Sequence, residues 1–252
     1  MSLVIYKFLA SLLIFLTSLV AVAYPVKVRA QPSHHRLLEL GDAFASGIFL
    51  GAALFHMLPD AIQDFSQALG NVHYPLAELL CAGGFLLLLF FERLSGNSSN
   101  NHYSILSSVV VIIIIIHSFI EGTVLGINST VATTAIIFLA IIVHKSSEGF
   151  MLAVTLMRSK IALKNIIILI AIFSCMTPAG IAFGTSLTML LQAQTGLLLT
   201  AGFNAFAAGT FLYMSTLHHI NHHQRSHHGE GLIEFVALVA GLSVMAGLAI
   251  QI

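Results

Sequence analysis

Residues 104–127 read SILSSVVVIIIIIHSFIEGTVLGI, a run that is long enough to cross the hydrocarbon core of a bilayer as one helix. The run contains one acidic residue, Glu121, and one histidine, His117, four positions before it. A second apolar run, 131–157, contains His144 and Glu148 at the same spacing. An ionised carboxylate inside a membrane costs free energy, so such residues usually mark a bound ion or a transport path. The two runs therefore predict membrane helices that carry chemistry.

The composition of the whole chain is that of an integral membrane protein. Hydrophobic residues make up 58% of its 252 residues, charged residues make up 8%, and the mean hydropathy is +0.97. A soluble domain carries roughly 25% charged residues, because its surface must be hydrated. Ten acidic residues balance ten basic ones, which removes the electrostatic case for binding nucleic acid. Cys81 and Cys175 lie in separate apolar runs and indicate neither a disulfide framework nor a zinc knuckle.

Apolar stretches predict an all-α fold with eight transmembrane helices in a single domain, 1–252. The predicted spans are 4–23, 40–62, 75–94, 104–127, 131–157, 162–188, 195–217 and 232–251. The first stretch also has features of a cleaved signal peptide, because Lys7 precedes an apolar run that ends in Ala21-Val22-Ala23. We favour a membrane helix there, because the internal repeat described below requires one.

The distribution of basic residues predicts that the N- and C-termini both lie outside. With this orientation, eight of the ten basic residues fall in inner loops, as the positive-inside rule requires. The glycosylation sequon Asn128-Ser129-Thr130 then falls in an outer loop. We expect a multi-pass protein of the cell membrane, either a bacterial inner membrane or a eukaryotic plasma membrane.

The chain also contains an internal repeat. Residues 41–60 (GDAFASGIFLGAALFHMLPD) align with 203–222 (FNAFAAGTFLYMSTLHHINH), with seven identical positions that include His56 and His218. The two copies lie in helices of opposite predicted direction, which makes the repeat inverted. Inverted repeats are typical of secondary transporters, which bind their substrate near the membrane midplane. We therefore predict three helices, a central pair, and three helices again.

The central pair carries two matching motifs, HSFIEG at 117–122 and HKSSEG at 144–149. Residues four apart lie on one face of a helix, and the short turn near 128–130 makes the two helices neighbours. His117, Glu121, His144 and Glu148 can therefore face one ion near the midplane. Nitrogen and oxygen ligands without a thiolate favour Zn²⁺, Fe²⁺ or Mn²⁺. The alternative is that each residue only packs between helices and makes a hydrogen bond. This would account for a single His or Glu, but it accounts poorly for two matched pairs on neighbouring helices.

These motifs resemble the ZIP family of divalent-metal transporters, and the resemblance extends over the whole chain. His56-Met57-Leu58-Pro59-Asp60 and Thr177-Pro178-Ala179-Gly180 are also similar to segments of that family. The resemblance implies transport of Zn²⁺, and of Fe²⁺, Mn²⁺ or Cd²⁺, into the cytoplasm, with the two motif histidines and two motif glutamates as ligands. It also implies movement of a central bundle, frequent homodimers, and no cofactor besides the transported ion.

Several auxiliary residues depart from this pattern or extend it. Members with two metal ions have carboxylate or amide groups after each motif His and a Glu before the Pro, where this chain has Ser118, Lys145 and Thr177. The cationic Lys145 argues for one ion. His56, Asp60 and His218 are candidates for way-stations on the path, or for residues that pack against polar helix ends.

The predicted inner loop 218–230 contains six histidines in eleven residues. The five solvent-facing ones could bind zinc weakly as accessory ligands, or belong to a solvated linker: His219, His222, His223, His227 and His228. His219-x-x-His222-His223 also matches one box of membrane di-iron desaturases, which is the alternative function. Such an oxidoreductase needs about three boxes and the chain offers one, so we expect no enzyme.

Overall fold

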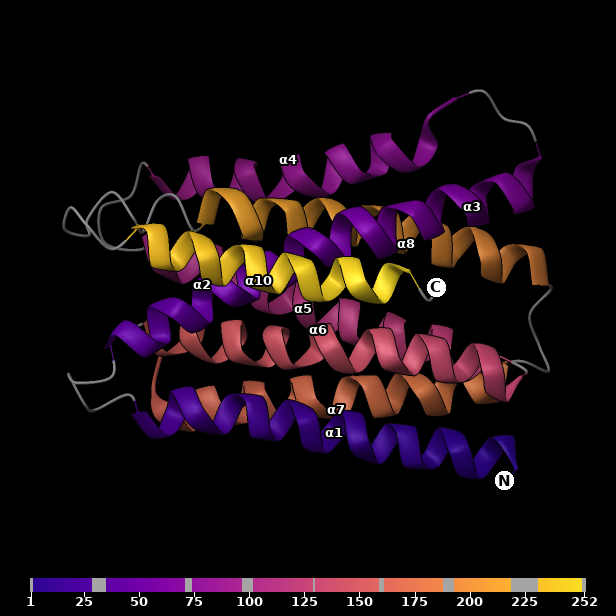
Figure 1. Ribbon diagram of the computed structural model, residues 1–252, viewed down its shortest axis with the longest axis horizontal. Coiled ribbons are helices and arrows are strands. Elements are labelled where there is room, and N and C mark those ends of the chain that lie inside the picture. Colours follow the sequence, from indigo (N-terminus) through magenta and orange to yellow (C-terminus); the bar gives the residue numbers. More distant parts are fainter. Residues whose placement is uncertain are drawn as a thin grey trace. The chain divides into compact units, whose positions relative to one another are not determined.

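The computed structural model describes residues 2–28, 35–70, 74–96, 102–128, 130–158, 161–187, 193–218 and 231–250. Almost all of these residues are helical, as Figure 1 shows. The α-helices are α1 (Leu3–Val28), α2 (His35–Ala52), α3 (Leu58–Leu69), α4 (Leu76–Gly96), α5 (His102–Ile127), α6 (Val131–Arg158), α7 (Leu163–Leu187), α8 (Ala193–Tyr213) and α10 (Gly231–Ala249). Two π-helical turns, η2 (Ala53–Met57) and η3 (Met214–His218), follow α2 and α8. Helices suit a bilayer because they satisfy their backbone hydrogen bonds internally.

Each predicted membrane span matches one helix of the structure, except that the second span corresponds to α2, η2 and α3 together. Within the described ranges, seven helices are long and apolar enough to cross a membrane. The remaining predicted span corresponds to α4, which is 21 residues long and carries Glu78, Glu92 and Arg93 near its ends. The second span is longer than predicted, because the helix runs through Arg36–Leu69. The all-α, multi-span fold is confirmed, whereas the side of the membrane on which the termini lie stays a prediction.

The chain divides into two compact units that follow the predicted repeat. Unit 1 consists of residues 1–29 and 107–193, and unit 2 consists of residues 30–106 and 194–252. Unit 1 therefore contains the first helix of each repeat, α1 and α7, together with the central pair, α5 and α6. Unit 2 contains the second and third helices of each repeat. The sequence predicted a single domain, 1–252, and this stays a prediction.

In unit 1, α1 packs against α6 and α7. Four buried side chains, one from each helix of the unit, form its apolar core: Ile14, Leu125, Ile141 and Ile181. Lys7 is buried and donates a hydrogen bond to the carbonyl oxygen of Gly126, at the end of α5. On the other side of α1, Phe8 and Val20 are 68% and 71% exposed, as expected of side chains that face lipid. These contacts make α1 a packed helix of unit 1, and its interpretation as a retained membrane helix stays a prediction.

In unit 2, two helix pairs pack in the same way at positions that the repeat makes equivalent. A Cβ atom added at Gly47 of α2 would collide with the carbonyl oxygen of Leu238 on α10. A Cβ added at the equivalent Gly209 of α8 would collide with the carbonyl oxygen of Cys81 on α4. Glycine at both positions allows the backbones of the paired helices to touch. The repeat seen in the sequence is therefore also a repeat of packing.

A second equivalent pair lies between the two copies. The rings of Phe49 on α2 and Phe211 on α8 meet edge to face, with centroids 4.7 Å apart. Both side chains are fully buried. Because these residues occupy the same position in the two copies, their contact joins the copies within unit 2.

The close contacts in unit 2 predict a difference between two adjacent glycines of α4. A Cβ at Gly84 would collide with the carbonyl oxygen of Phe206, whereas a Cβ at Gly83 would have no heavy atom within 4 Å. We expect Gly84→Ala to destabilise the protein by about 1–3 kcal/mol, because backbone must move to make room. Thermal unfolding in detergent measures the effect, and Gly83→Ala is the matched control. Equal stability of the two variants would contradict the packing described here.

The helix from α2 to α3 is continuous but contains the π-turn η2. Ala52 and Leu58, which flank the turn, both have right-handed helical dihedral angles. Pro59 follows directly, and a proline lacks the N–H that would bond to the carbonyl four residues earlier. A wider turn before Pro59 accommodates this missing bond. Upstream of the turn the helix packs against α10, and downstream it packs against α4.

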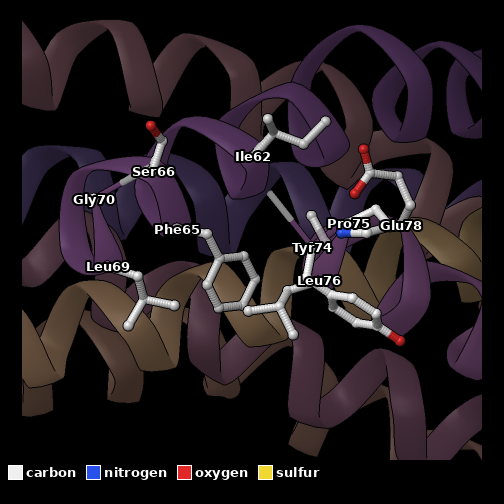
Figure 2. Close-up of a pocket in the computed structure, with 10 residues that line it drawn as sticks. Ile62, Phe65, Ser66, Leu69, Gly70, Tyr74, Pro75, Leu76 and Glu78 are labelled. Carbon is white, nitrogen blue, oxygen red and sulfur yellow. The ribbon is translucent and has the colours of Figure 1, made fainter. Parts of the chain in front are cut away.

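A cavity of about 350 Å³ lies where α3 meets α4 in unit 2 (Figure 2). Its lining is largely apolar and includes Ile62, Phe65, Leu69 and Tyr74. Glu78 is the one ionisable carboxylate among the residues that line it. The described residues that line the cavity therefore offer no set of metal ligands.

Candidate metal site

The two motifs bring their four side chains together in unit 1. His117 and Glu121 come from α5, and His144 and Glu148 come from α6. One ligand atom from each residue lies within 4.8 Å of all the others. All four side chains are buried, with at most 8% of any residue exposed. The predicted convergence of the two H-x-x-x-E motifs is therefore present in the structure.

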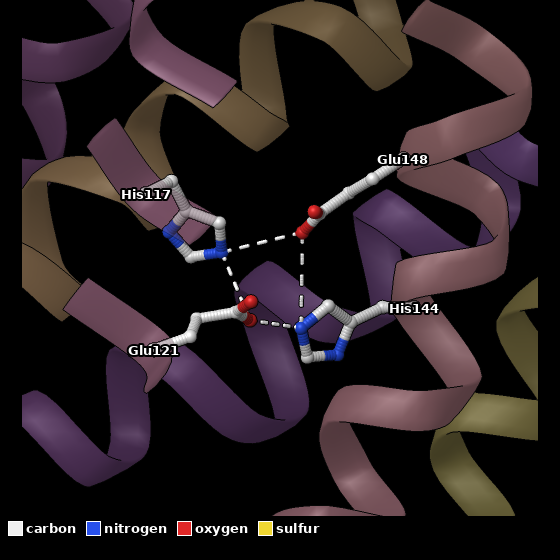
Figure 3. A group of neighbouring side chains, drawn as sticks. All are labelled: His117, Glu121, His144 and Glu148. Atoms are coloured by element: carbon white, nitrogen blue, oxygen red, sulfur yellow. Dashed lines mark hydrogen bonds and ion pairs between the residues drawn. The ribbon is translucent and has the colours of Figure 1, made fainter. Parts of the chain in front are cut away.

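The ligand atoms alternate between nitrogen and oxygen (Figure 3). Nε2 of His117 lies 3.0 Å from Oε1 of Glu121 and 3.4 Å from Oε1 of Glu148. Nε2 of His144 contacts Oε1 of Glu121 and lies 3.8 Å from Oε1 of Glu148. Oε1 of Glu148 is buried and accepts no hydrogen bond from any residue that the structure describes. Two imidazole nitrogens and two carboxylate oxygens thus point at one small volume, which is a suitable donor set for a transition-metal ion.

Lys145 lies beside this group and is fully buried. Its ammonium donates to Oε2 of Glu148 at 2.8 Å and to Oγ of Ser118 at 2.6 Å, and lies 3.6 Å from Oε2 of Glu121. The ammonium also lies over the ring of Phe173 on α7, 4.5 Å from the ring centroid. Lys145 therefore contacts both motif glutamates. The contact with Phe173 was not predicted, because nothing in the sequence marks this phenylalanine among the eighteen in the chain.

The central glycines explain how α5 and α6 come close to the outer helices of unit 1. Gly122, directly after Glu121, lies against the backbone of Thr177 on α7, where an added Cβ would collide with the carbonyl oxygen of Thr177. Gly149, directly after Glu148, lies against α1, where an added Cβ would be 3.3 Å from the carbonyl oxygen of Ser18. Each motif glutamate is therefore followed by a glycine that lets its helix pack closely against a neighbour.

Two hydroxyl groups on α7 are buried near these contacts. Thr177, an auxiliary candidate from the sequence, and Ser174, which was not predicted, are both fully buried. Neither hydroxyl makes a hydrogen bond to a described residue. Thr177 is not one of the four residues whose ligand atoms converge. Its role as an auxiliary residue stays a prediction.

The remaining candidates lie in unit 2 or outside the described residues. Nδ1 of His56, in η2, lies 3.0 Å from Oδ2 of Asp60, in α3. His218 is the last residue of η3, and its side chain lies outside the described part of the chain. Both repeat copies therefore have a π-turn that includes the shared histidine, a feature that the sequence alone did not reveal. The five accessory loop histidines are outside the described ranges: His219, His222, His223, His227 and His228.

Comparison with known proteins gives one consistent result. A model described as ZIP zinc transporter matches residues 4–103 and 94–249. The chain is 30% identical over 261 residues to zinc transporter ZIP1 of Takifugu rubripes, covering 86% of each protein. It is 26% identical to zinc transporter ZIP1 of Homo sapiens, covering 95% of this chain and 89% of that protein. It is 25% identical to zinc transporter ZIP2 of Mus musculus, covering 73% and 76% of the two proteins.

Proposed function

The chain belongs to the ZIP zinc transporter family, and on this premise we propose that it moves Zn²⁺ into the cytoplasm through the His/Glu group of α5 and α6. The protein is a multi-pass protein of the cell membrane, and seven helices within its described residues are long and apolar enough to cross a membrane. The observation that carries the proposed route is the convergence of four buried ligand atoms within 4.8 Å of one another.

The chemistry of the group supports a divalent transition metal as substrate. Imidazole nitrogens favour Zn²⁺, Fe²⁺ or Mn²⁺ over Mg²⁺ and Ca²⁺, which prefer oxygen ligands. Thiolate and thioether ligands, which favour Cu⁺, do not occur among the four side chains. Lys145 offsets only one of the two buried carboxylate charges, and a bound divalent ion supplies further positive charge. We propose His117, Glu121, His144 and Glu148 as the ligands of the ion in transit.

Lys145 supports a site for one ion. Each carboxylate directs one oxygen toward the histidines and the other toward Lys145. A second metal ion that shared Glu121 and Glu148 with the first would need the place of this ammonium. Because of these contacts of Lys145, we propose that the site holds one ion.

An enzymatic function is not favoured. The desaturase alternative depends on His219, His222 and His223, which lie outside the described residues, and on further His boxes that the sequence does not contain. The family is one of transporters. We propose transport without an enzymatic reaction, and with no cofactor besides the transported ion.

Other residues have auxiliary roles in the proposal. The His56–Asp60 pair, and His218 in the equivalent turn, are proposed as transient contacts for the ion on its path. Thr177, on α7, is proposed as an auxiliary residue beside the site. Assembly into a homodimer is proposed from family membership alone.

Uptake into proteoliposomes tests the proposed function. Purified protein should accumulate radioactive Zn²⁺ well above protein-free vesicles, and Cd²⁺, Fe²⁺ or Mn²⁺ should compete. Mg²⁺ and Ca²⁺ in excess should compete little, because imidazole ligands are unfavourable for them. Zinc accumulation equal to that of protein-free vesicles, in protein shown to be folded, would reject the proposal.

The histidine loop is expected to be accessory. Replacing five loop histidines by Ser should leave maximal uptake largely intact and change the apparent affinity by only a few fold, because the loop lies outside the predicted spans. The variant changes these residues: His219, His222, His223, His227 and His228. Uptake kinetics in proteoliposomes measure both quantities. A complete loss of uptake at normal protein level would place the loop on the transport path instead.

A further inference from the structure

Lys145 brings a fixed positive charge into the proposed ion site. Its side chain is fully buried, and its ammonium lies within 3.6 Å of carboxylate oxygens of both Glu121 and Glu148. With both glutamates ionised, the three side chains carry two negative charges and one positive charge. When a divalent ion binds, the site therefore has an excess positive charge. Without the ammonium, the same site with a bound ion would be neutral.

Two partners can hold the ammonium while the glutamates bind an ion. Oγ of Ser118 accepts from Lys145 at 2.6 Å and donates its own hydrogen to the carbonyl oxygen of Ile114 at 2.7 Å. The hydroxyl hydrogen is therefore directed away from Lys145, which leaves a lone pair for the ammonium. The face of the Phe173 ring attracts the same ammonium from 4.5 Å. Ser118 and Phe173 are uncharged and are not among the four converging ligands.

We propose that Lys145 is a resident cation that weakens binding of the transported ion and so speeds its release, and that Ser118 and Phe173 hold its ammonium while the ion is bound and so limit this weakening. The proposal rests on the proposed function of the His/Glu site. A transporter must release its substrate in every cycle, and tight binding of substrate alone does not raise the turnover rate. A fixed cation beside a divalent ion lowers the affinity by repulsion in a site where screening by water is weak.

Removal of the charge is the first test. Lys145→Met in protein with the five loop histidines replaced by Ser should bind Zn²⁺ about tenfold more tightly or better, since even part of the repulsion is worth that factor. Calorimetric titration in detergent measures the affinity. In proteoliposomes the same variant should have a lower KM and a lower kcat than its parent. Unchanged or weaker zinc binding by Lys145→Met would overturn the proposal.

Removal of the ring is the second test, and it changes affinity in the opposite direction. In Phe173→Leu the ammonium loses the ring face and interacts more strongly with the glutamates, so Zn²⁺ should bind several-fold more weakly. Phe173→Tyr retains a ring and should resemble the parent. In the Lys145→Met background, Phe173→Leu should have no further effect on affinity, because its action requires the ammonium. An equal effect of Phe173→Leu in both backgrounds would indicate a packing role and overturn the proposal.

The two proposals fail in different ways. If the parent protein neither binds nor accumulates zinc, the proposed function itself is wrong. If the parent binds and transports zinc but Lys145→Met does not bind it more tightly, only the role of the resident cation is wrong. Should Lys145→Met not fold, the comparison of Phe173→Leu with Phe173→Tyr still decides, because equal affinities in these two variants contradict the role of the ring.

Discussion

Zinc uptake by Glu121→Gln or Glu148→Gln protein is expected to fall to the level of protein-free vesicles. Each substitution keeps the shape of the side chain but removes one of the two negative charges in a buried site that also contains Lys145. The remaining glutamate and Lys145 then cancel, so little attraction for a divalent ion is left at a place where water cannot compensate. Radioactive zinc uptake in proteoliposomes measures the loss.

Glu78→Gln is the matched control for these variants. Glu78 lies in the first turn of α4 in unit 2 and is exposed, so the same change of charge should leave uptake near that of the wild-type protein. Protein level and thermal stability of all three variants should be compared in detergent. Near-normal uptake by folded Glu121→Gln or Glu148→Gln protein would show that zinc takes a different route.

One metal ion per chain is expected in protein whose five loop histidines are replaced by Ser, and two in the same protein with Lys145→Asp. Oε2 of Glu148 and Oε2 of Glu121 both face the ammonium of Lys145. Replacing the ammonium by a carboxylate removes the repulsion and adds a ligand, so both glutamates could bridge two ions, as in two-metal sites about 3.5–4 Å apart. Elemental analysis after gel filtration, together with calorimetry, measures the number of ions.

Lys145→Met serves as the control for this stoichiometry. It removes the positive charge without adding a ligand, and should therefore still bind one ion. Two ions in the parent protein, with Lys145 intact, would contradict the single-ion site. One ion in folded Lys145→Asp protein would show that the ammonium is not what prevents a second ion from binding.

The convergence of the four motif side chains could be predicted from the sequence because their geometry is local. A His and a Glu four residues apart share a helix face wherever the helix lies, and a short turn makes α5 and α6 neighbours. The contact of Lys145 with Phe173 could not be predicted in this way. It depends on how α7 packs against the central pair, and an aromatic residue in an apolar helix carries no pattern that distinguishes it from core.

The helix ends and the π-turns show the same limit. Hydropathy located the second span at 40–62, whereas the helix continues to Leu69. Hydropathy missed this part because α3 is amphipathic and its polar residues lower the mean hydropathy. The π-turns at 53–57 and 214–218 have no sequence signature of their own, although Pro59 marks one of them in retrospect. The internal repeat, in contrast, was visible in the sequence because its small residues are required wherever two backbones touch.

The π-turn η2 changes the angular phase of the helix that contains it. In an α-helix each residue advances the side-chain direction by about 100°, so one extra residue in a turn rotates everything after it by that amount. Gly47 before the turn faces α10, whereas Ala61 after it is packed with Ala77 of α4. In a straight α-helix without this turn, residues spaced by whole heptads would face the same neighbour along the whole length. The inserted residue therefore allows one continuous helix to pack against α10 before the turn and against α4 after it, without an intervening loop.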